Sequence, residues 1–124
     1  MQVILDTNIL LLPFTANRDI FSEIDTKITQ AHELCVVQGT IDELQKIKNN
    51  QRGKDAKAAD VGLQLIKAKD LKIIPQLLLS VDEELVRLSG KGIIIATLDK
   101  ELRDRIKEKG GSLLIIRENQ VEMI

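Results

Sequence analysis

The amino-acid sequence predicts an α/β protein with three layers, α/β/α, in which helices cover both faces of a central parallel sheet. Two observations carry this prediction. Continuously apolar segments of strand length recur along the chain, as expected of strands that are buried on both faces. Segments with apolar residues at helical spacing lie between them, and this alternation is typical of parallel sheets. The chain has 124 residues, of which 44% are hydrophobic and 30% charged, and suits a single domain over residues 1–124.

The first part of the chain predicts two strands separated by a helix. Val3–Leu5 is a short apolar run that ends at the turn-forming sequence Asp6-Thr7-Asn8, and we interpret it as the first strand. Leu34–Val37 is the second strand. Between them Asn17 is a suitable N-cap for a helix. The apolar face of that helix is predicted to consist of Ile20, Ile24, Ile28 and Ala31.

Two further helices are predicted to follow the second strand. Gly39-Thr40 interrupts the pattern before the first of them, and the polar loop Asn49–Gly53 separates the two. Each helix has an apolar face at helical spacing. These faces are Ile41, Leu44 and Ile47 in the first helix, and Ala58, Val61, Leu65 and Ala68 in the second.

The second half of the chain predicts three more strands and two more helices. The strands are Ile73-Ile74, Ile93–Ala96 and, as the last strand, Leu113–Ile116. Each helix is marked by its apolar face and by the glycines that end it. Ser80 opens a helix with Val81, Leu85 and Leu88 that ends at Gly90 and Gly92; Leu98, Leu102 and Ile106 mark a helix that ends at Gly110-Gly111.

Composition disfavours several classes of protein. No apolar run approaches the roughly 18 residues that a membrane span needs, and no basic segment precedes the first strand, so we expect a cytoplasmic protein. Cys35 is the only cysteine, which excludes an internal disulfide and a Cys-based zinc site, and we expect it in the core. A net charge of −1, with Phe14 and Phe21 as the only aromatic residues, argues against a basic or base-stacking nucleic-acid module.

Four carboxylates stand at comparable places along the predicted elements. Asp6 directly follows the first strand, and Asp99 stands three residues after Ala96 at the start of a helix. Glu43 and Asp82 lie in the first turns of helices that follow loops. In an open parallel sheet, ligands bind beyond the carboxyl ends of the strands, near the point where the strand order reverses. We therefore expect these four side chains to converge on one edge of the sheet.

Oxygen ligands of this kind suit Mg²⁺ and Mn²⁺, and four converging acids would repel one another strongly without a cation. One metal ion or a pair would relieve that repulsion, activate a water molecule and stabilise the departing oxygen during in-line cleavage of a phosphodiester. The sequence therefore predicts a Mg²⁺ or Mn²⁺ site whose metal ligands and catalytic residues are Asp6, Glu43, Asp82 and Asp99.

By their order and spacing, four motifs resemble those of the PIN-domain nucleases, and the resemblance runs from Val3 to about Arg117. The motifs are Val3–Asn8, Ile41–Leu44, Val81–Leu85 and Ile95–Leu102. The resemblance implies a PIN-like (Rossmann-like) fold and a divalent-metal-dependent endoribonuclease that hydrolyses RNA phosphodiester bonds. It also implies that the family's metal-binding acids are Asp6, Glu43, Asp82 and Asp99, and that Asn8 and Thr97 are polar residues that support them.

Two residues depart from the family's pattern. Leu98 stands where many relatives carry Asn, which would remove a polar helper, and Glu83 stands where the rRNA-processing branch often carries a second Asp. Leu11–Phe14 looks more like the small-subunit rRNA-processing branch than like VapC-type toxins. The family further implies a homodimer and, depending on the branch, an antitoxin or a ribosome-assembly partner. A VapC-type toxin ribonuclease and a non-catalytic RNA- or protein-binding module remain as alternatives.

Each acid also has a structural interpretation at a helix start. Thr40-x-x-Glu43 and Ser80-x-x-Glu83 both fit the capping box, in which an acid reaches back to a backbone N–H. Asp6, Asp82 and Asp99 likewise suit N-cap or first-turn positions. All four acids together, in the expected order, favour the metal site over four separate caps.

A basic stretch follows the second acid. It contains Lys46, Lys48, Arg52, Lys54 and Lys57, with only Asp55 opposing them. We hypothesise that Lys48, Arg52 and Lys54 contact RNA phosphates, with a solvated surface as the alternative. The single histidine, His32, lies near the end of a predicted helix, where the helix dipole explains it.

Other acidic or phosphate-binding α/β proteins fit the sequence less well. A phosphatase of the Asp-x-Asp type needs a second Asp where this chain has Asn8. A phosphoryl-receiver domain needs an acidic pair near the first strand and an acceptor Asp after the third, and neither is present. The chain also lacks the Gly-x-x-x-x-Gly-Lys-Ser/Thr loop of P-loop nucleotide hydrolases.

Overall fold

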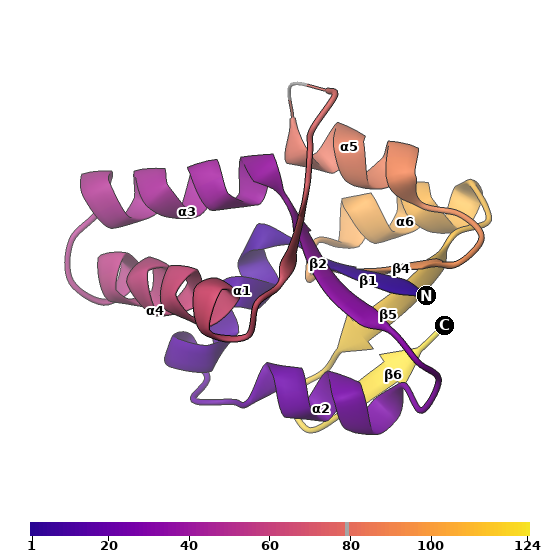
Figure 1. The fold of residues 1–124 in the computed structure, drawn as a ribbon, viewed down its shortest axis with the longest axis horizontal. Helices are drawn as coiled ribbons and strands as arrows, with labels where there is room; N and C mark the ends of the chain where they lie inside the picture. Colours follow the sequence, from indigo (N-terminus) through magenta and orange to yellow (C-terminus); the bar gives the residue numbers. More distant parts are fainter. Residues whose placement is uncertain (79) are drawn as a thin grey trace.

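The centre of the molecule is a twisted sheet. The computed structural model describes residues 1–78 and 80–124, in which six strands follow the order β3-β2-β1-β4-β5-β6 (Figure 1). Neighbouring strands from β3 to β5 are parallel, which confirms the predicted fold class for this part of the sheet. The strands are β1 (Gln2–Leu5), β2 (Glu33–Val37), β3 (Lys72–Ile74), β4 (Ile93–Ala96), β5 (Ser112–Ile116) and β6 (Val121–Met123).

Strand β6 corrects the prediction of a purely parallel sheet that ends at Leu113–Ile116. It pairs antiparallel with β5, with Ile116 opposite Val121, and it forms one edge of the sheet. The four residues between the two strands permit only a hairpin, because a parallel return needs a crossover of a dozen or more residues. The three residues of β6 contain no apolar run, so hydrophobic pattern alone did not reveal this strand.

Helices cover both faces of the sheet. Alternate residues of each strand point to opposite faces, so Val3 and Leu5 of β1 pack into one apolar cluster and Ile4 into the other. The first four helices contribute to the cluster of Val3 and Leu5, and the last two to the cluster of Ile4. The helices are α1 (Thr7–Thr15), α2 (Ile20–Lys27), α3 (Gln38–Asn50), α4 (Lys54–Ala68), α5 (Val81–Leu88) and α6 (Lys100–Glu108).

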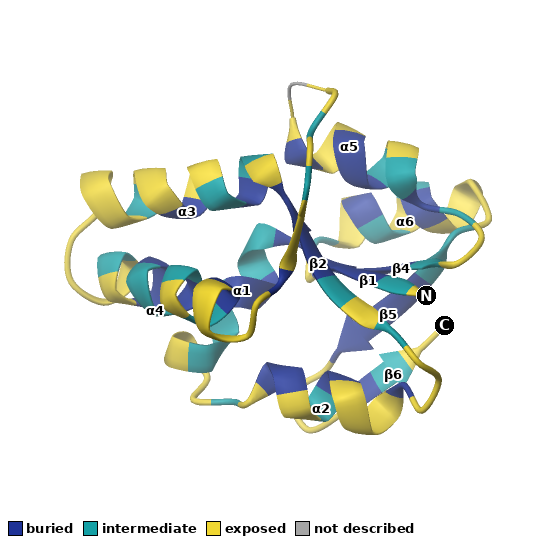
Figure 2. Cartoon of the chain, in the orientation of Figure 1, coloured by how far each residue is buried: buried dark blue, intermediate teal, exposed yellow. Residues whose placement is uncertain are grey.

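The buried residues follow this three-layer arrangement. Figure 2 shows them along the strands and on the sides of the helices that face the sheet, while the outer sides of α3 and α4 are exposed. Cys35 is fully buried, as predicted, and burial raises the pKa of its thiol to about 11. Within residues 1–78 and 80–124, no helix combines the length and the apolar character required to cross a bilayer.

Helix α2 is shorter than predicted and begins at a different cap. Asp19 is the N-cap, and its Oδ1 atom accepts a hydrogen bond of 3.2 Å from the backbone N–H of Ser22. Asn17 instead has a positive φ of 51° in the turn before the helix. The helix ends at Lys27, so Ile28 is its C-cap and the exposed Ala31 lies outside it.

Three helical predictions fail for a common reason, which is that neighbouring elements decide where a helix starts and which side it buries. Helix α3 starts at Gln38, directly after β2, so Gly39-Thr40 lies inside its first turn and does not precede it. Helix α6 starts after Asp99, which leaves Leu98 outside the helix and 39% exposed. The buried side of α4 consists of Ala58, Ala59, Gly62 and Ile66, rather than the predicted Ala58, Val61, Leu65 and Ala68.

The shifted face of α4 follows from a close contact with α1. A Cβ atom added to Gly62 would lie 2.7 Å from the backbone oxygen of Leu10, so only glycine permits this approach of the two helices. The contact sets the rotation of α4 about its axis. Consequently Val61 and Leu65 are only half-buried although their spacing is helical.

His32 lies beyond the end of α2, which corrects its assignment to a helix end. Its Nε2 atom is 2.7 Å from Asp25 Oδ1, and its Nδ1 atom is 2.8 Å from the backbone oxygen of Gln30. The contact with the Gln30 oxygen and the pairing with Asp25 both raise the pKa of His32 above its ordinary value.

A raised histidine pKa makes stability depend on pH. The contribution of His32 is complete below its unfolded pKa and is lost as the pH rises through the higher folded value. We expect His32→Gln to lower the free energy of unfolding by about 0.5 kcal/mol near pH 5 and by less near pH 8. Urea denaturation at both pH values measures the difference, and an equal loss at both would contradict the pairing.

Candidate functional site

The carboxyl ends of β1 and β4 lie side by side at the point where the strand order reverses. From β1 the sheet continues to β2 and β3 on one side and to β4 and β5 on the other. Leu5 is paired with Ala96 at the strand ends, and the Asp6 N–H donates to the Ala96 oxygen at 2.9 Å. Ligands of open parallel sheets bind beyond such a point, so the residues that follow these two strands form the candidate site.

Asp6 is held rigidly at this edge. It is only 5% exposed, and each carboxylate oxygen has a donor. Oδ1 accepts from the Thr7 N–H at 2.8 Å, which makes Asp6 the N-cap of α1. Oδ2 accepts from the Thr97 hydroxyl at 2.6 Å and from the Asn8 amide at 3.3 Å. The structural role and the site position therefore coexist in one side chain.

Thr97 and Asn8 link Asp6 to the loop that carries Asp99. The Thr97 hydroxyl is fully buried and accepts a hydrogen bond of 3.1 Å from the Asp99 N–H. Asn8 Oδ1 accepts one of 3.2 Å from the Leu98 N–H. Leu98 thus takes part in the network through its backbone N–H, because its side chain has no polar atom. Asp99 is the N-cap of α6, with Oδ1 accepting from the Leu102 N–H at 3.2 Å.

Glu43 reaches the same edge from α3. Its Oε1 atom accepts a hydrogen bond of 2.6 Å from the Thr7 hydroxyl, and Thr7 Oγ1 also lies 3.2 Å from Thr40 Oγ1. The capping-box interpretation of Thr40 and Glu43 is wrong, because α3 begins earlier and its N-cap, Val37, has no side-chain bond. Thr7 and Thr40 were not predicted as site residues: Thr40 was expected only in the capping box, and the one signal for Thr7 was its position beside Asp6.

Asp82 occupies the first turn of α5, where Ser80 is the N-cap. Partial desolvation raises the pKa of Asp82, and the neighbouring Asp99 raises it further. The Glu83 side chain turns away from this group, since its Oε1 atom pairs with Arg105 at 3.0 Å. The Ser80 hydroxyl oxygen accepts a hydrogen bond of 3.1 Å from the Glu83 N–H. The predicted capping box thus forms only in its Ser80 half, because the Glu83 side chain is directed to Arg105.

Electrostatic repulsion connects the four acids. Burial raises the pKa of Asp6, and the negative charges of Asp82 and Glu43 raise it further. Asp99 acts in the same direction on Asp82. Glu43 and Asp82 also line one cavity of about 430 Å³ between α3 and α5. Each of the four predicted acids is thus within electrostatic range of at least one other: Asp6 of Asp82 and Glu43, and Asp82 of Asp99.

A divalent cation suits the chemistry of this edge. Among residues 1–78 and 80–124, no three His, Cys, Asp or Glu side chains are arranged as a ready metal cluster. The available donors are nevertheless all carboxylate oxygens, which Mg²⁺ and Mn²⁺ prefer, and these ions usually retain several waters. Because the Asp6 charge is buried and repelled by its neighbours, a cation would stabilise it. The ligand chemistry, and not a preformed cluster, is what favours a divalent cation at this edge.

The basic residues predicted to contact RNA lie elsewhere. The end of α3 at Asn50 is about 10 Å along the helix from Glu43. Arg52 belongs to the loop that follows α3, and Lys54 is the first residue of α4; Figure 1 shows this loop at the end of α3 away from the sheet. Lys48 pairs with Asp60 of α4 at 3.1 Å, so its charge is already partnered. The structure does not bring these three residues to the acidic edge, and their contact with RNA stays a prediction.

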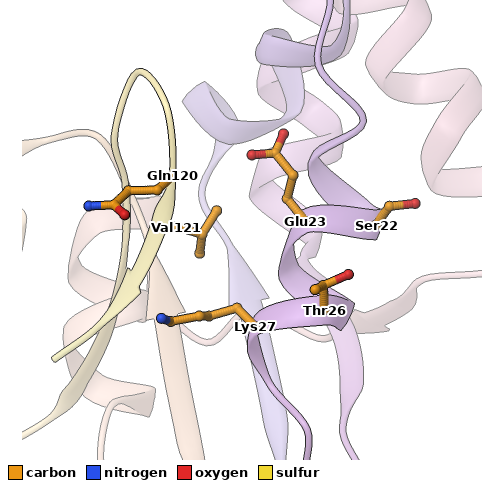
Figure 3. Close-up of a pocket in the computed structure, with 6 residues that line it drawn as sticks. All are labelled: Ser22, Glu23, Thr26, Lys27, Gln120 and Val121. Atoms are coloured by element: carbon orange, nitrogen blue, oxygen red, sulfur yellow. The ribbon is translucent and has the colours of Figure 1, made fainter.

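A separate cavity lies between α2 and β6. It has a volume of about 380 Å³ and contains none of the predicted site residues (Figure 3). Lys27 extends across it toward Val121, and Glu23 is paired with Arg18 at 2.5 Å. Its two charged residues, Glu23 and Lys27, both come from α2, and the cavity lies at the edge strand β6, away from the point where the strand order reverses.

Fold and site together define a Rossmann-like α/β protein with acids at the reversal of its strand order. A model of the PIN-like domain family matches residues 3–119. The chain therefore belongs to the PIN-like domain family, as its motifs predicted. Ribonuclease VapC4 of Methanocaldococcus jannaschii is 23% identical over 121 residues, which cover 96% of this chain and 92% of that protein.

Solved structures share the fold. The structure of the PIN domain endonuclease Utp24 has a TM-score of 0.81 at 21% identity, over 98% of this chain and 90% of that one. VapBC-1 from nontypeable Haemophilus influenzae has a TM-score of 0.54 at 14% identity, over 97% of this chain and 100% of that one. The fold is therefore more similar to that of Utp24 than to that of VapBC-1.

Proposed function

We propose that this chain is an endoribonuclease that hydrolyses RNA phosphodiester bonds with Mg²⁺ or Mn²⁺ held by Asp6, Glu43, Asp82 and Asp99. The observation that carries the proposal is the network around Asp6, in which a buried carboxylate is fixed by Thr97 and Asn8 beside three other acids. The ribonuclease relative VapC4 supports the same chemistry.

The side chains have distinct roles in this proposal. A bound ion would lower the pKa of a water molecule and neutralise charge on the phosphate. Asp6 supplies a fixed negative charge, and the Thr97 and Asn8 donors hold its orientation. Thr7 sets the position of Glu43 through its hydroxyl. Asp82 is exposed, and Ser80 and not Asp82 caps α5, so the Asp82 side chain can adjust to the ion and the substrate.

The direct experiment incubates the purified chain with single-stranded and structured RNA and with Mg²⁺, Mn²⁺ or EDTA. We expect internal cleavage that requires the metal. Cleavage that persists in EDTA would remove the metal from the proposal, and no cleavage of a broad RNA set with either ion would remove the nuclease activity.

Metal binding also predicts a change in stability. A ligand that binds only the folded state adds about 2.7 kcal/mol at a free concentration of 100 times its Kd. We expect Mn²⁺ to raise the melting temperature of this chain in a saturable manner, because the ion relieves repulsion among the acids. Differential scanning calorimetry with increasing Mn²⁺ measures the shift, and Asp6→Asn should lose most of it. A non-catalytic binding module without a metal site would show no saturable shift.

For the cellular role we propose RNA processing. The fold is closer to the endonuclease Utp24, by a TM-score of 0.81, than to VapBC-1, and Leu11–Phe14 agrees with that branch. The identity with Ribonuclease VapC4 favours a toxin as the second candidate. Induced expression in a bacterial host separates the two, because a toxin arrests growth and an antitoxin partner restores it.

A further inference from the structure

The cavity beside Glu43 and Asp82 is also lined by residues that have no role in the proposed metal site. It lies between the first turns of α3 and the start of α5, and Lys46, Gln76 and Ser80 form its other walls. Its volume of about 430 Å³ lies within the range of small-ligand sites, which starts at roughly 300 Å³. It opens directly beside two of the proposed metal ligands.

Lys46 supplies a positive charge inside this acidic surrounding. It follows Glu43 by three residues and Asp42 by four, so the three side chains lie on one side of α3. Within residues 1–78 and 80–124, the Lys46 ammonium group makes no ion pair, although Asp42, Glu43 and Asp82 line the same cavity. Lys48, two residues further on, is by contrast paired with Asp60. Lys46 therefore has its charge available for a ligand.

The opposite wall is fixed before any ligand binds. Gln76 Oε1 accepts the Gly39 N–H at 2.7 Å, which ties the loop before α5 to the start of α3. The buried Glu84 carboxylate accepts the Leu77 N–H of this loop at 3.0 Å. A wall that is already ordered reduces the entropy lost on binding.

We propose that this cavity binds the nucleotide next to the scissile phosphate of the RNA strand, with Lys46 in contact with that nucleotide's phosphate. The inference rests on the proposed function, since it extends the same site. A phosphate matches the unpaired ammonium group, and the Ser80 hydroxyl suits a ribose. The strand would run from the acidic edge along the first turns of α3, and not toward Arg52 and Lys54.

The test compares Lys46→Ala and Lys46→Arg with the unaltered chain on one single-stranded RNA oligonucleotide. We expect Lys46→Ala to raise KM about threefold to tenfold with little change in kcat, and Lys46→Arg to retain most of the affinity. Binding of the same oligonucleotide to the Asp6→Asn chain, with and without Lys46→Ala, should show a salt slope smaller by about 0.7 when Lys46 is lost.

Matched controls separate the outcomes. Lys107→Ala removes an exposed helical lysine of α6 and should leave KM unchanged. Equal KM and salt slope for Lys46→Ala and the unaltered chain, in a protein that cleaves RNA, would overturn this inference while leaving the nuclease in place. A larger loss from Arg52→Ala and Lys54→Ala than from Lys46→Ala would overturn it in favour of the other end of α3. An unaltered chain that cleaves no RNA would overturn the proposed function itself.

Discussion

Asp6→Asn is expected to lower kcat for RNA cleavage by more than about 100-fold, because loss of a residue that merely supports a metal ligand already costs 10- to 100-fold. Asparagine keeps the shape of the side chain and can still accept the Thr7 N–H, so α1 keeps its cap. What disappears is the negative charge. Thr97→Val removes the 2.6 Å hydrogen bond to Oδ2, and we expect it to lower kcat by about 10- to 100-fold, less than Asp6→Asn does.

The same substitution should stabilise the metal-free chain. Burial raises the pKa of Asp6, so ionisation of this residue opposes folding above its ordinary pKa. Removing the charge is therefore expected to raise the melting temperature in EDTA at neutral pH, and this gain should shrink as the pH falls. Activity and stability would then move in opposite directions, as they do where a strained site serves function.

Single-turnover cleavage assays and melting curves in EDTA and in Mn²⁺ measure both effects. Asp104→Asn is the matched control, because Asp104 is an exposed acid of α6 whose partner is the exposed Lys100 at 3.0 Å. Full activity of purified Asp6→Asn, or a Mn²⁺ stabilisation equal to that of the unaltered chain, would show that Asp6 was wrongly assigned to the site.

The largest expected effect on folding comes from Glu84, a fully buried carboxylate outside the acidic edge. Oε1 and Oε2 each accept a hydrogen bond of 2.9 Å from Arg87, and they also accept the N–H groups of Leu77 and Leu78. Glu84→Ala leaves these donors without their acceptor. We expect the free energy of unfolding to fall by about 2–3 kcal/mol, measured by urea denaturation at neutral pH.

The contribution of Glu84 to the free energy of unfolding should depend on pH. Hydrogen bonds from Arg87 outweigh burial and, with the Leu77 N–H, lower the pKa of Glu84 to about 2. Its contribution is thus complete above the ordinary glutamate pKa of 4.5 and is lost as the pH falls through about 2. The stability difference between the unaltered chain and Glu84→Ala should narrow over that range. Glu83→Ala, which breaks only an exposed pair with Arg105, should cost less than about 1 kcal/mol and serves as the control.

If Glu84→Ala unfolds no more easily than Glu83→Ala, the buried network does not stabilise the loop. A folded Glu84→Ala chain offers a second measurement, because the loop that Glu84 holds leads directly to Asp82. We expect its metal affinity to fall along with its stability.

The strands and the strand-end acids were predictable because both depend on local sequence. Ile93–Ala96 is apolar throughout and must be buried, so the residues after it are placed at the carboxyl end of the sheet. Asp6 is placed in the same way after β1. The buried side of α4 could not be predicted from the hydrophobic pattern, because the contact of Gly62 with Leu10 decided which side was buried.

The sequence by itself determined the α/β alternation, the parallel centre of the sheet and the strand-end positions of Asp6 and Asp99, because each follows from apolar runs and the residues next to them. Only the tertiary structure decided that Glu43 bonds to Thr7, that Glu83 turns to Arg105 and that Lys46 faces the cavity. These contacts join residues from different elements. They depend on where α3 starts after β2 and how α5 packs beside it, which no local pattern specifies.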